Sequence, residues 1–291
     1  MSSHHRWSQS FNPDLGIGFK KPGMNQISRC QPGLGTLVEI NIQGDCDDAV
    51  LIEASRHAFA VISEVTQAMS FHDQSSELSI INQQAHHQPV KVGVHTARVL
   101  HMAQQMYQDS AGVFDVSVGS WLVNDGLLPE TMVALTNVPD LSQMKLNDRQ
   151  VRFKRPLTLD LGGIAKGYAV DVAMDRIKAC LNQQLIQASV NAGGDMKVYD
   201  WHNYEVLVPD VHKQVKSLYM KRSSVASSSS YYLAGNSAIY DPKQGCQVEL
   251  GTTVSVFADS CMVADALTKV AAVVGKTDPI FERYEAEVMM V

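Results

Sequence analysis

The chain has 291 residues, of which 45% are hydrophobic and 19% are charged, and its formal net charge is −6 at pH 7. A chain of this length can bury enough surface to fold without disulfide or metal staples, and its apolar content excludes a disordered protein. The acidic balance, without any run of basic residues, argues against nucleic acid as a partner. No apolar stretch approaches the ~18 residues that cross a bilayer, so we expect no transmembrane segment.

The first 33 residues are polar and interrupted by proline and glycine. This composition predicts a flexible N-terminal arm, or an extended strand that wraps the fold, ahead of a single domain over residues 34–291. The segment lacks the basic start and apolar core of a secretory signal, and no lipoprotein cleavage box precedes Cys30. We therefore expect a cytoplasmic protein. The five scattered cysteines predict reduced thiols and no disulfide framework.

Hydrophobic periodicity gives the expected elements in chain order. Alternation over Thr36–Ile42 predicts a half-buried strand, and helical spacing predicts helices at about 48–68, 96–109 and 164–181. Residues 76–81 fit a short helix or turn. Short strands are expected at 151–153, 157–161, 188–191, 196–199, 204–209, 218–226 and 238–241. An apolar helix over 260–274, ended by Gly275, is expected to close the chain. Strands and helices interleave without βαβ regularity, which predicts an α+β fold.

One stretch, Leu159–Asp171, has the design of a phosphate cradle. An expected strand delivers Asp160, and two glycines then allow a tight turn and a close approach of ligand to backbone. The helix that follows offers free N–H groups to an anion, and Lys166 in its first turn can reach the same anion. The Walker order of glycines and lysine is absent. A plain strand, turn and helix with a surface lysine explains this stretch alone equally well.

Other motifs are weaker when each is taken alone. Residues 191–195 place paired glycines and an acid after a strand, as many hairpins do. Ser224–Ser230 is either a flexible loop or a row of hydroxyls lining a phosphate or ribose pocket. Asp265 lies in an apolar helix, where an acid is usually paired, used as a cap, or bound to a metal.

Taken together and in this order, these segments resemble the FAD:protein FMN transferase family, also named ApbE. The resemblance runs from about Gly33 to Gly275. It rests on Gly35-Thr36, Met69-Ser70, Phe114-Asp115, Asp160–Asp171, Asn191–Asp195, Asp241-Pro242 with Gly245, and Ala264–Leu267. It implies a T-fold-like α+β architecture in which helices pack on mixed or antiparallel sheets.

The resemblance also implies an activity. Members split the pyrophosphate of FAD, transfer FMN to a Ser or Thr of an acceptor flavoprotein, and release AMP with the help of Mg²⁺. The family pattern assigns metal binding to Gly163, Asp265, Thr268 and Lys269, with Asp265 also catalytic. It assigns FAD binding to Leu34, His72, Val113, Phe114, Asp115, Asp160, Lys166 and Ile239. Members of the family are commonly periplasmic or membrane-anchored.

Two departures from the family pattern bear on the chemistry. Many members have a histidine three residues before the Asp-Pro pair, where this chain has Ala238, so His72 becomes the candidate base. Members usually carry a threonine four residues after the metal aspartate, where this chain has Lys269, and Thr268 is displaced by one position. The lysine ammonium could occupy the place of the cation. Three functions therefore stay open: an FMN transferase, a relative that binds FAD without transfer, and an FAD pyrophosphatase that gives FMN and AMP.

Overall fold

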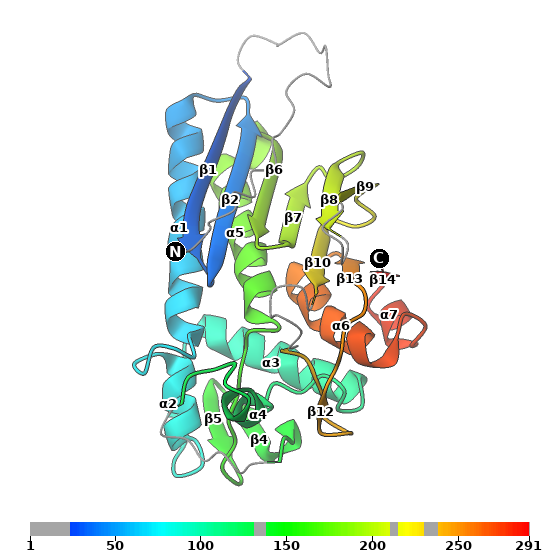
Figure 1. Ribbon diagram of the computed structural model, residues 1–291. Coiled ribbons are helices and arrows are strands. Elements are labelled where there is room, and N and C mark those ends of the chain that lie inside the picture. Colours follow the sequence, from blue (N-terminus) through cyan, green and yellow to red (C-terminus); the bar gives the residue numbers. More distant parts are fainter. Residues whose placement is uncertain (1–23, 131–137, 210–214, 230–237, 291) are drawn as a thin grey trace, which may run out of the picture.

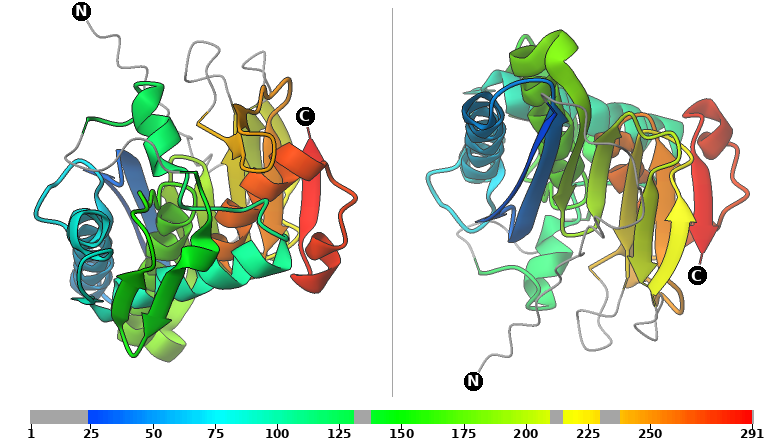
Figure 2. Two further views of the ribbon diagram at one scale, coloured as in Figure 1. Left: turned by 90° about the horizontal axis from the view of Figure 1, so that it is seen from below. Right: turned by 90° about the horizontal axis from the view of Figure 1, so that it is seen from above.

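The computed structural model describes residues 24–130, 138–209, 215–229 and 238–290. Its centre is a seven-stranded antiparallel sheet in the order β1-β2-β6-β7-β10-β13-β14 (Figure 1). The strands are β1 (Asn25–Gly33), β2 (Thr36–Gly44), β6 (Leu185–Ala192), β7 (Asp195–Tyr199), β10 (Ser224–Ser228), β13 (Val254–Ala258) and β14 (Glu287–Met290). Both views in Figure 2 place β1 and β14 at opposite edges of this sheet.

Three long helices pack on this sheet. They are α1 (Asp48–Met69), which contacts β1 and β2, α5 (Ala165–Leu181), which contacts β6 and β7, and α6 (Cys261–Val274), which contacts β10 and β13. Because α5 also touches both α1 and α6, it is the central helix of the layer. The start of α5 is thereby fixed against both its neighbours.

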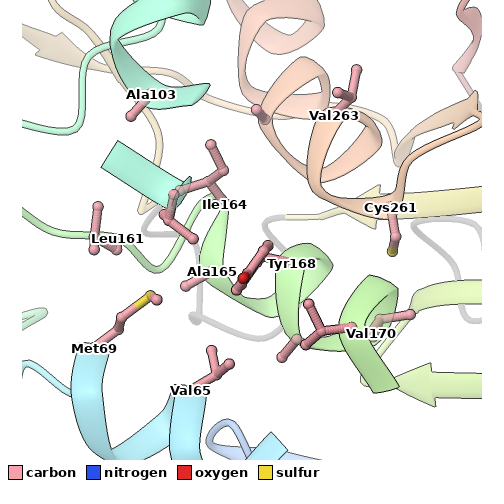
Figure 3. Close-up of a cluster of buried hydrophobic side chains, with 14 of the residues drawn as sticks. Val65, Met69, Ala103, Leu161, Ile164, Ala165, Tyr168, Val170, Cys261 and Val263 are labelled. Atoms are coloured by element: carbon pink, nitrogen blue, oxygen red, sulfur yellow. The ribbon is translucent and has the colours of Figure 1, made fainter. Parts of the chain in front are cut away.

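The main hydrophobic core fills the space around α5. Figure 3 shows Val65 and Met69 of α1 on one side of Ile164 and Tyr168, with Val263 of α6 on the other side. All five side chains are buried. Spacings of three and four residues bring the apolar side chains of each helix onto one face. This packing holds the glycine turn before α5 in place.

A smaller unit lies below the main sheet in Figure 1. It contains a three-stranded sheet in the order β3-β5-β4. Its elements are α2 (Glu77–Gln84), β3 (Val90–Lys91), α3 (Val94–Asp109), α4 (Gly119–Asn124), β4 (Met144–Asn147) and β5 (Gln150–Phe153), with a 3₁₀ turn at Leu141–Gln143. Another 3₁₀ turn at Asn182–Gln184 links α5 to β6.

Two hairpins and a last short helix complete the described chain. β8 (Glu205–Pro209) and β9 (Val215–Tyr219) form one hairpin, and β11 (Tyr240–Asp241) and β12 (Cys246–Gln247) form the other. Val206 and Val208 of β8 join a second apolar cluster with residues of β7, β10 and β13. The short helix α7 (Ile280–Arg283) leads into β14.

The expected α+β class is confirmed, and several local expectations are corrected. Of the two alternatives for the first 33 residues, Asn25–Gly33 takes the extended strand and not the flexible arm, because it pairs along its whole length with β2. The chain does not close with α6, since α7 and β14 follow it. The strand expected over residues 218–226 is two strands, β9 and β10, separated by a turn. Residues 1–23 lie outside the described part of the chain.

The strand expected at residues 157–161 is also wrong, for a specific reason. The side-chain amide of Asn82 donates to the carbonyl of Leu159 at 2.9 Å and accepts from its N–H at 2.8 Å. The buried side chain of Asn82 thus makes the hydrogen bonds that a neighbouring strand would make. Within residues 157–161, the single β-bridge pairs Val118 with Thr158. Among the described residues, none of the helices combines the length and the apolar character that a membrane crossing requires.

Candidate active site

A cavity of about 900 Å³ opens where the turns of the main sheet meet the start of α5. The β1–β2 turn and the β6–β7 turn form one side of it, through Thr36 and Gly193. A Cβ on Gly193 would lie 2.7 Å from the hydroxyl oxygen of Thr36, so these turns fit together only because that position is glycine. Gly193 also has φ = 64°, a left-handed conformation that glycine adopts without strain.

The phosphate-cradle stretch lies in this cavity, as three of its residues show. Asp160, Gly163 and Lys166 all line it. The carboxylate of Asp160 accepts a hydrogen bond from the N–H of Gly162 at 3.2 Å. Burial nevertheless raises the pKa of Asp160 above its ordinary value. The glycine turn therefore leads directly from a half-buried acid to a lysine at the start of a helix.

Four charged side chains, Lys166, Asp195, Asp265 and Lys269, form what we call the charged tetrad. Lys166 of α5 donates a short hydrogen bond to Asp195 at the start of β7 and lies 3.9 Å from Oδ2 of Asp265. Lys269 donates to Oδ1 of Asp265 at 2.5 Å, one turn along α6. Asp265 is fully buried and Asp195 nearly so, whereas both lysines line the cavity. The tetrad thus presents its ammonium groups toward any bound molecule.

Opposite charges of the tetrad favour the ionised forms of Asp265 and Lys166. Burial alone would raise the pKa of Asp265, but Lys166 and Lys269 hold it below its usual value. Burial likewise opposes the charge of Lys166, but Asp195 and Asp265 raise its pKa. Burial and the charge of Asp265 raise the pKa of Asp195. A hydrogen bond from the N–H of Gly167, at 3.2 Å, also favours the ionised form of Asp265.

Apolar residues line the same cavity as the two lysines of the tetrad. Val113 and Phe114 line it from the loop before α4, and Ile239 lines it from the segment before β11. Asp115 lines it as well, but its carboxylate holds the loop together: it accepts from the N–H and hydroxyl of Ser117 and from the N–H of Leu141. Burial raises the pKa of Asp115. A cavity lined by both ammonium groups and apolar side chains suits a partly hydrophobic molecule that carries phosphates.

Three other predicted site residues lie beside the cavity and do not line it. Leu34 sits in the β1–β2 turn with φ = 55° and packs on the core. His72 is exposed, and its charge lowers the pKa of Asp160, against the larger effect of burial. Thr268 is buried, donates to the carbonyl of Asp265 at 2.7 Å, and shares a hydrogen bond of 2.8 Å with Ser228.

The residues predicted to hold magnesium do not fit that ion. Both oxygens of Asp265 already accept from hydrogen-bond donors, one from Lys269 and the other from Gly167. Thr268 is turned to its own backbone, which leaves the carbonyl of Gly163 as a remaining oxygen. Within the part of the chain that the structure describes, no group of three His, Cys, Asp or Glu side chains could hold a metal. Magnesium prefers oxygen ligands in octahedral geometry. The group that lies against Oδ1 of Asp265 is instead the ammonium of Lys269, which cannot bind a cation.

The structure adds residues that were not among the predicted site residues. Asp195 completes the tetrad, and the signal for it was an acid directly after a two-glycine turn. Tyr240 lines the cavity and donates a short hydrogen bond to Asp125. Gln247 donates to the same carboxylate at 2.8 Å, which ties the β11–β12 hairpin to the end of α4. No sequence pattern links residues so far apart.

The serine-rich stretch contributes to the cavity as a strand. Ser224–Ser228 forms β10, and Ser227, Ser228 and Ser229 line the cavity. The interpretation as a row of hydroxyls near a ligand is therefore favoured over a flexible loop for these residues. Residues 230–237 lie outside the described part of the chain.

Comparison with known proteins decides the family. Residues 34–289 match the profile of the ApbE family. The chain belongs to the ApbE family. A relative from Vibrio cholerae named FAD:protein FMN transferase is 27% identical over 289 residues, which cover 89% of this chain and 84% of the relative. A relative of the same name from Rhodobacter capsulatus is 26% identical, and the chain spans 50% of its length.

Solved structures agree with this assignment to the ApbE family. The flavin transferase ApbE from Vibrio cholerae is 25% identical, with a TM-score of 0.75 over 92% of this chain and 93% of that one. The ApbE protein of Thermotoga maritima is 23% identical, with a TM-score of 0.80 over 92% and 94% of the two chains. The ApbE architecture implied by the sequence motifs is therefore confirmed.

Proposed function

We propose that this ApbE-family chain is an FAD:protein FMN transferase. It transfers the FMN half of FAD to a Ser or Thr hydroxyl of an acceptor flavoprotein and releases AMP. The observation that carries the proposal is that two lysines and several apolar side chains line one cavity. FAD has matching parts: an anionic pyrophosphate, and ring systems that bury apolar surface. The names of the relatives point to the same substrate.

The transfer exchanges one phosphorus–oxygen bond for another. The acceptor hydroxyl oxygen attacks the phosphorus of the FMN half, and a new P–O bond forms. The bond from that phosphorus to the bridging oxygen breaks, and AMP leaves with the electron pair. Negative charge grows on the phosphate oxygens, and fixed cations stabilise it. Lys166 and Lys269 are the cations that this chain provides at the cavity.

The hydroxyl must also lose a proton, and His72 is our proposed base. Ala238 stands where many family members have a histidine, and it is exposed. His72 lies near enough to Asp160 to influence the pKa of that carboxyl. An imidazole is a common general base for proton removal near neutral pH. In this proposal Asp160 orients His72 or the ribityl end of FAD, while Asp265 acts by positioning both lysines.

The acceptor is proposed to be a separate flavoprotein that carries a Ser or Thr flavinylation motif, as the family resemblance implies. The expectation of a cytoplasmic location remains a prediction, and so does the single domain over residues 34–291. The Mg²⁺ dependence implied by the family does not match the donor set around Asp265.

The test combines the protein, FAD and an acceptor domain with the motif D-x-x-[ST]-G-A-[ST]. Mass spectrometry of the acceptor detects covalent FMN, and chromatography of the supernatant detects AMP. An adduct together with an equal amount of AMP is the expected result. The variant Lys166→Met should lose both products, whereas Lys145→Met, which alters an exposed lysine of β4, should keep them.

A second candidate function is FAD binding without transfer. One observation favours it: among the described residues, none that lines the cavity is a histidine. In the same test this function predicts bound FAD, no adduct and no AMP. AMP with free FMN and no adduct would instead identify an FAD pyrophosphatase.

A further inference from the structure

We propose that the ammonium of Lys269 is a built-in replacement for a divalent cation, so that this site binds the pyrophosphate of FAD without a metal. The inference rests on the proposed function only in naming FAD as the ligand. It follows from how Lys269 is placed, from what surrounds Asp265, and from the charge balance of the tetrad.

Lys269 places its ammonium at the carboxylate of Asp265, to which the family pattern assigns the metal. It follows Asp265 by one turn of α6, and its Nζ lies 2.5 Å from Oδ1 of that residue. Its side chain passes directly over Gly163: a Cβ on that glycine would lie 3.1 Å from Cε of Lys269. The side chain is only 22% exposed, and it lines the cavity. A surface lysine that merely extended into water would have none of these restraints.

A divalent ion would compete with Lys269 for the same carboxylate. Magnesium binds carboxylate oxygens at about 2.0–2.1 Å, so an ion on Oδ1 of Asp265 would lie within a few ångströms of the ammonium. Two cations at that distance repel each other strongly in a partly buried site. The other oxygen, Oδ2, accepts from the N–H of Gly167 and lies 3.9 Å from Lys166. Asp265 is therefore already neutralised by groups of the chain itself.

The charge balance leaves room for an anion and not for a further cation. Two lysines oppose two aspartates in the tetrad, and both aspartates are buried behind them. A pyrophosphate entering from the cavity meets the two ammonium groups first. Each ammonium has three donors and uses one or two on its aspartate, so donors remain for phosphate oxygens. The arrangement provides two separate positive charges for the two phosphates.

The decisive measurement is FAD affinity, by calorimetry or quenching of flavin fluorescence, in excess EDTA and in saturating Mg²⁺. The wild-type affinity is expected to agree within about twofold between the two conditions. Lys269→Met is expected to bind about tenfold or more weakly in both, since a charged hydrogen bond is lost. Lys269→Thr is expected to bind weakly in EDTA and to recover when Mg²⁺ is added. Lys145→Met serves as the matched control and should bind FAD as the wild type does.

Direct metal binding gives an independent readout. Electron paramagnetic resonance of added Mn²⁺ should show no bound ion in the wild type and a bound ion in Lys269→Thr with FAD. Wild-type FAD affinity that rises about tenfold with Mg²⁺, or unchanged affinity in Lys269→Met, overturns the inference and leaves the proposed function standing. Absence of FAD binding in every condition overturns both. Equal binding with and without metal but no transfer supports the inference and rejects the transferase. The wild-type comparison requires no variant to fold.

Discussion

Gly167 of α5 lies directly against the backbone of Cys261 at the start of α6. A Cβ on Gly167 would approach the carbonyl oxygen of Cys261 to 2.3 Å, and backbone atoms cannot yield as a flexible side chain can. The two helices therefore cross closely at this point. That crossing places Lys166 and Lys269, which come from different helices, on the same buried carboxylate.

The first prediction concerns this contact. Gly167→Ala should lower the free energy of unfolding by about 1–3 kcal/mol, because a methyl group is forced into a filled space. Within an ordinary helix the same exchange stabilises by about 1 kcal/mol, so the sign of the change tests the contact. Urea unfolding measures it. Gly251→Ala is the control, since nothing lies within 4 Å of its added Cβ; an equal loss there would refute the explanation.

The second prediction concerns the tetrad. Breaking a buried ion pair by removing one partner typically costs about 3–5 kcal/mol of unfolding free energy. Asp265→Asn should cost an amount near the lower end of that range, because both lysines can still turn toward the cavity. Adding Lys269→Met should cost less than the sum of the single changes. Urea unfolding of the single and double variants gives the coupling. Strict additivity would show that the two side chains do not interact.

Acid should remove the same contribution. The pKa of Asp265 is lowered by Lys166 and Lys269 despite burial, so its stabilisation is fully present above the ordinary value of 3.8. It is lost as pH falls through the lower folded value. The gap in unfolding free energy between wild type and Asp265→Asn should therefore shrink below about pH 3.8. A gap that grew with acid would contradict this.

The third prediction concerns the cavity wall. Burial and the hydrogen bond to Asp125 raise the pKa of Tyr240 to about 12. Tyr240→Phe should cost about 1 kcal/mol at pH 8, the usual net value of such a bond. Because the raised pKa belongs to the folded state, the contribution is present below pH 10 and fades as pH rises toward 12. Urea unfolding at several alkaline pH values tests this, with Tyr204→Phe, whose ring packs on the second apolar cluster, as the control.

The fourth prediction concerns Lys166. Lys166→Met should weaken FAD binding about tenfold or more, through loss of a charged hydrogen bond to phosphate. It should also leave the buried Asp195 without its partner and so lower stability. Titration with FAD and thermal melting give the two readouts separately. Unchanged FAD affinity in a folded variant would remove Lys166 from the binding site.

The fifth prediction concerns His72. If it removes the proton of the acceptor hydroxyl, His72→Ala should slow FMN transfer by about 10²-fold or more and leave FAD affinity nearly unchanged. Single-turnover mass spectrometry of the acceptor measures the rate. His87→Ala, another exposed histidine, is the matched control. Transfer at the wild-type rate in His72→Ala would exclude the proposed base.

Local patterns predicted the long helices well. The helix α1 carries apolar residues every three or four positions and was expected within a residue or two of its observed bounds. The strand β1 was difficult to predict, because its sequence lacks a regular pattern of apolar residues. Its burial alternates between half-buried and exposed because it is an edge strand, and it holds polar residues and Pro32. Its partner β2, not its own sequence, makes it a strand.

The candidate site could be predicted only in part. The pattern of residues 160–166 predicted an anion-binding turn, because glycines and a helix start act locally. The structure places Asp160, Gly163 and Lys166 at the cavity. The contact of Lys166 with Asp195 and the contact of Lys269 with the buried Asp265 depend on helix crossing and sheet order, which no local pattern encodes. The seven short motifs indicated the family because their order was preserved. Their mutual geometry came only with the structure.

The two-glycine turn between β6 and β7 limits how the sequence of this protein can evolve. Asp195 is paired with Ala192 across that turn, and neighbouring positions of a strand face opposite sides of a sheet. Loss or gain of one residue in β7 beside the turn would rotate the carboxylate away from Lys166 and put its neighbour in its place. Point substitutions in the wall of the cavity can be accepted one at a time, but a change of length here removes a charge from the site in a single step. Natural variants of this protein should therefore differ in the residues around this turn while keeping its length.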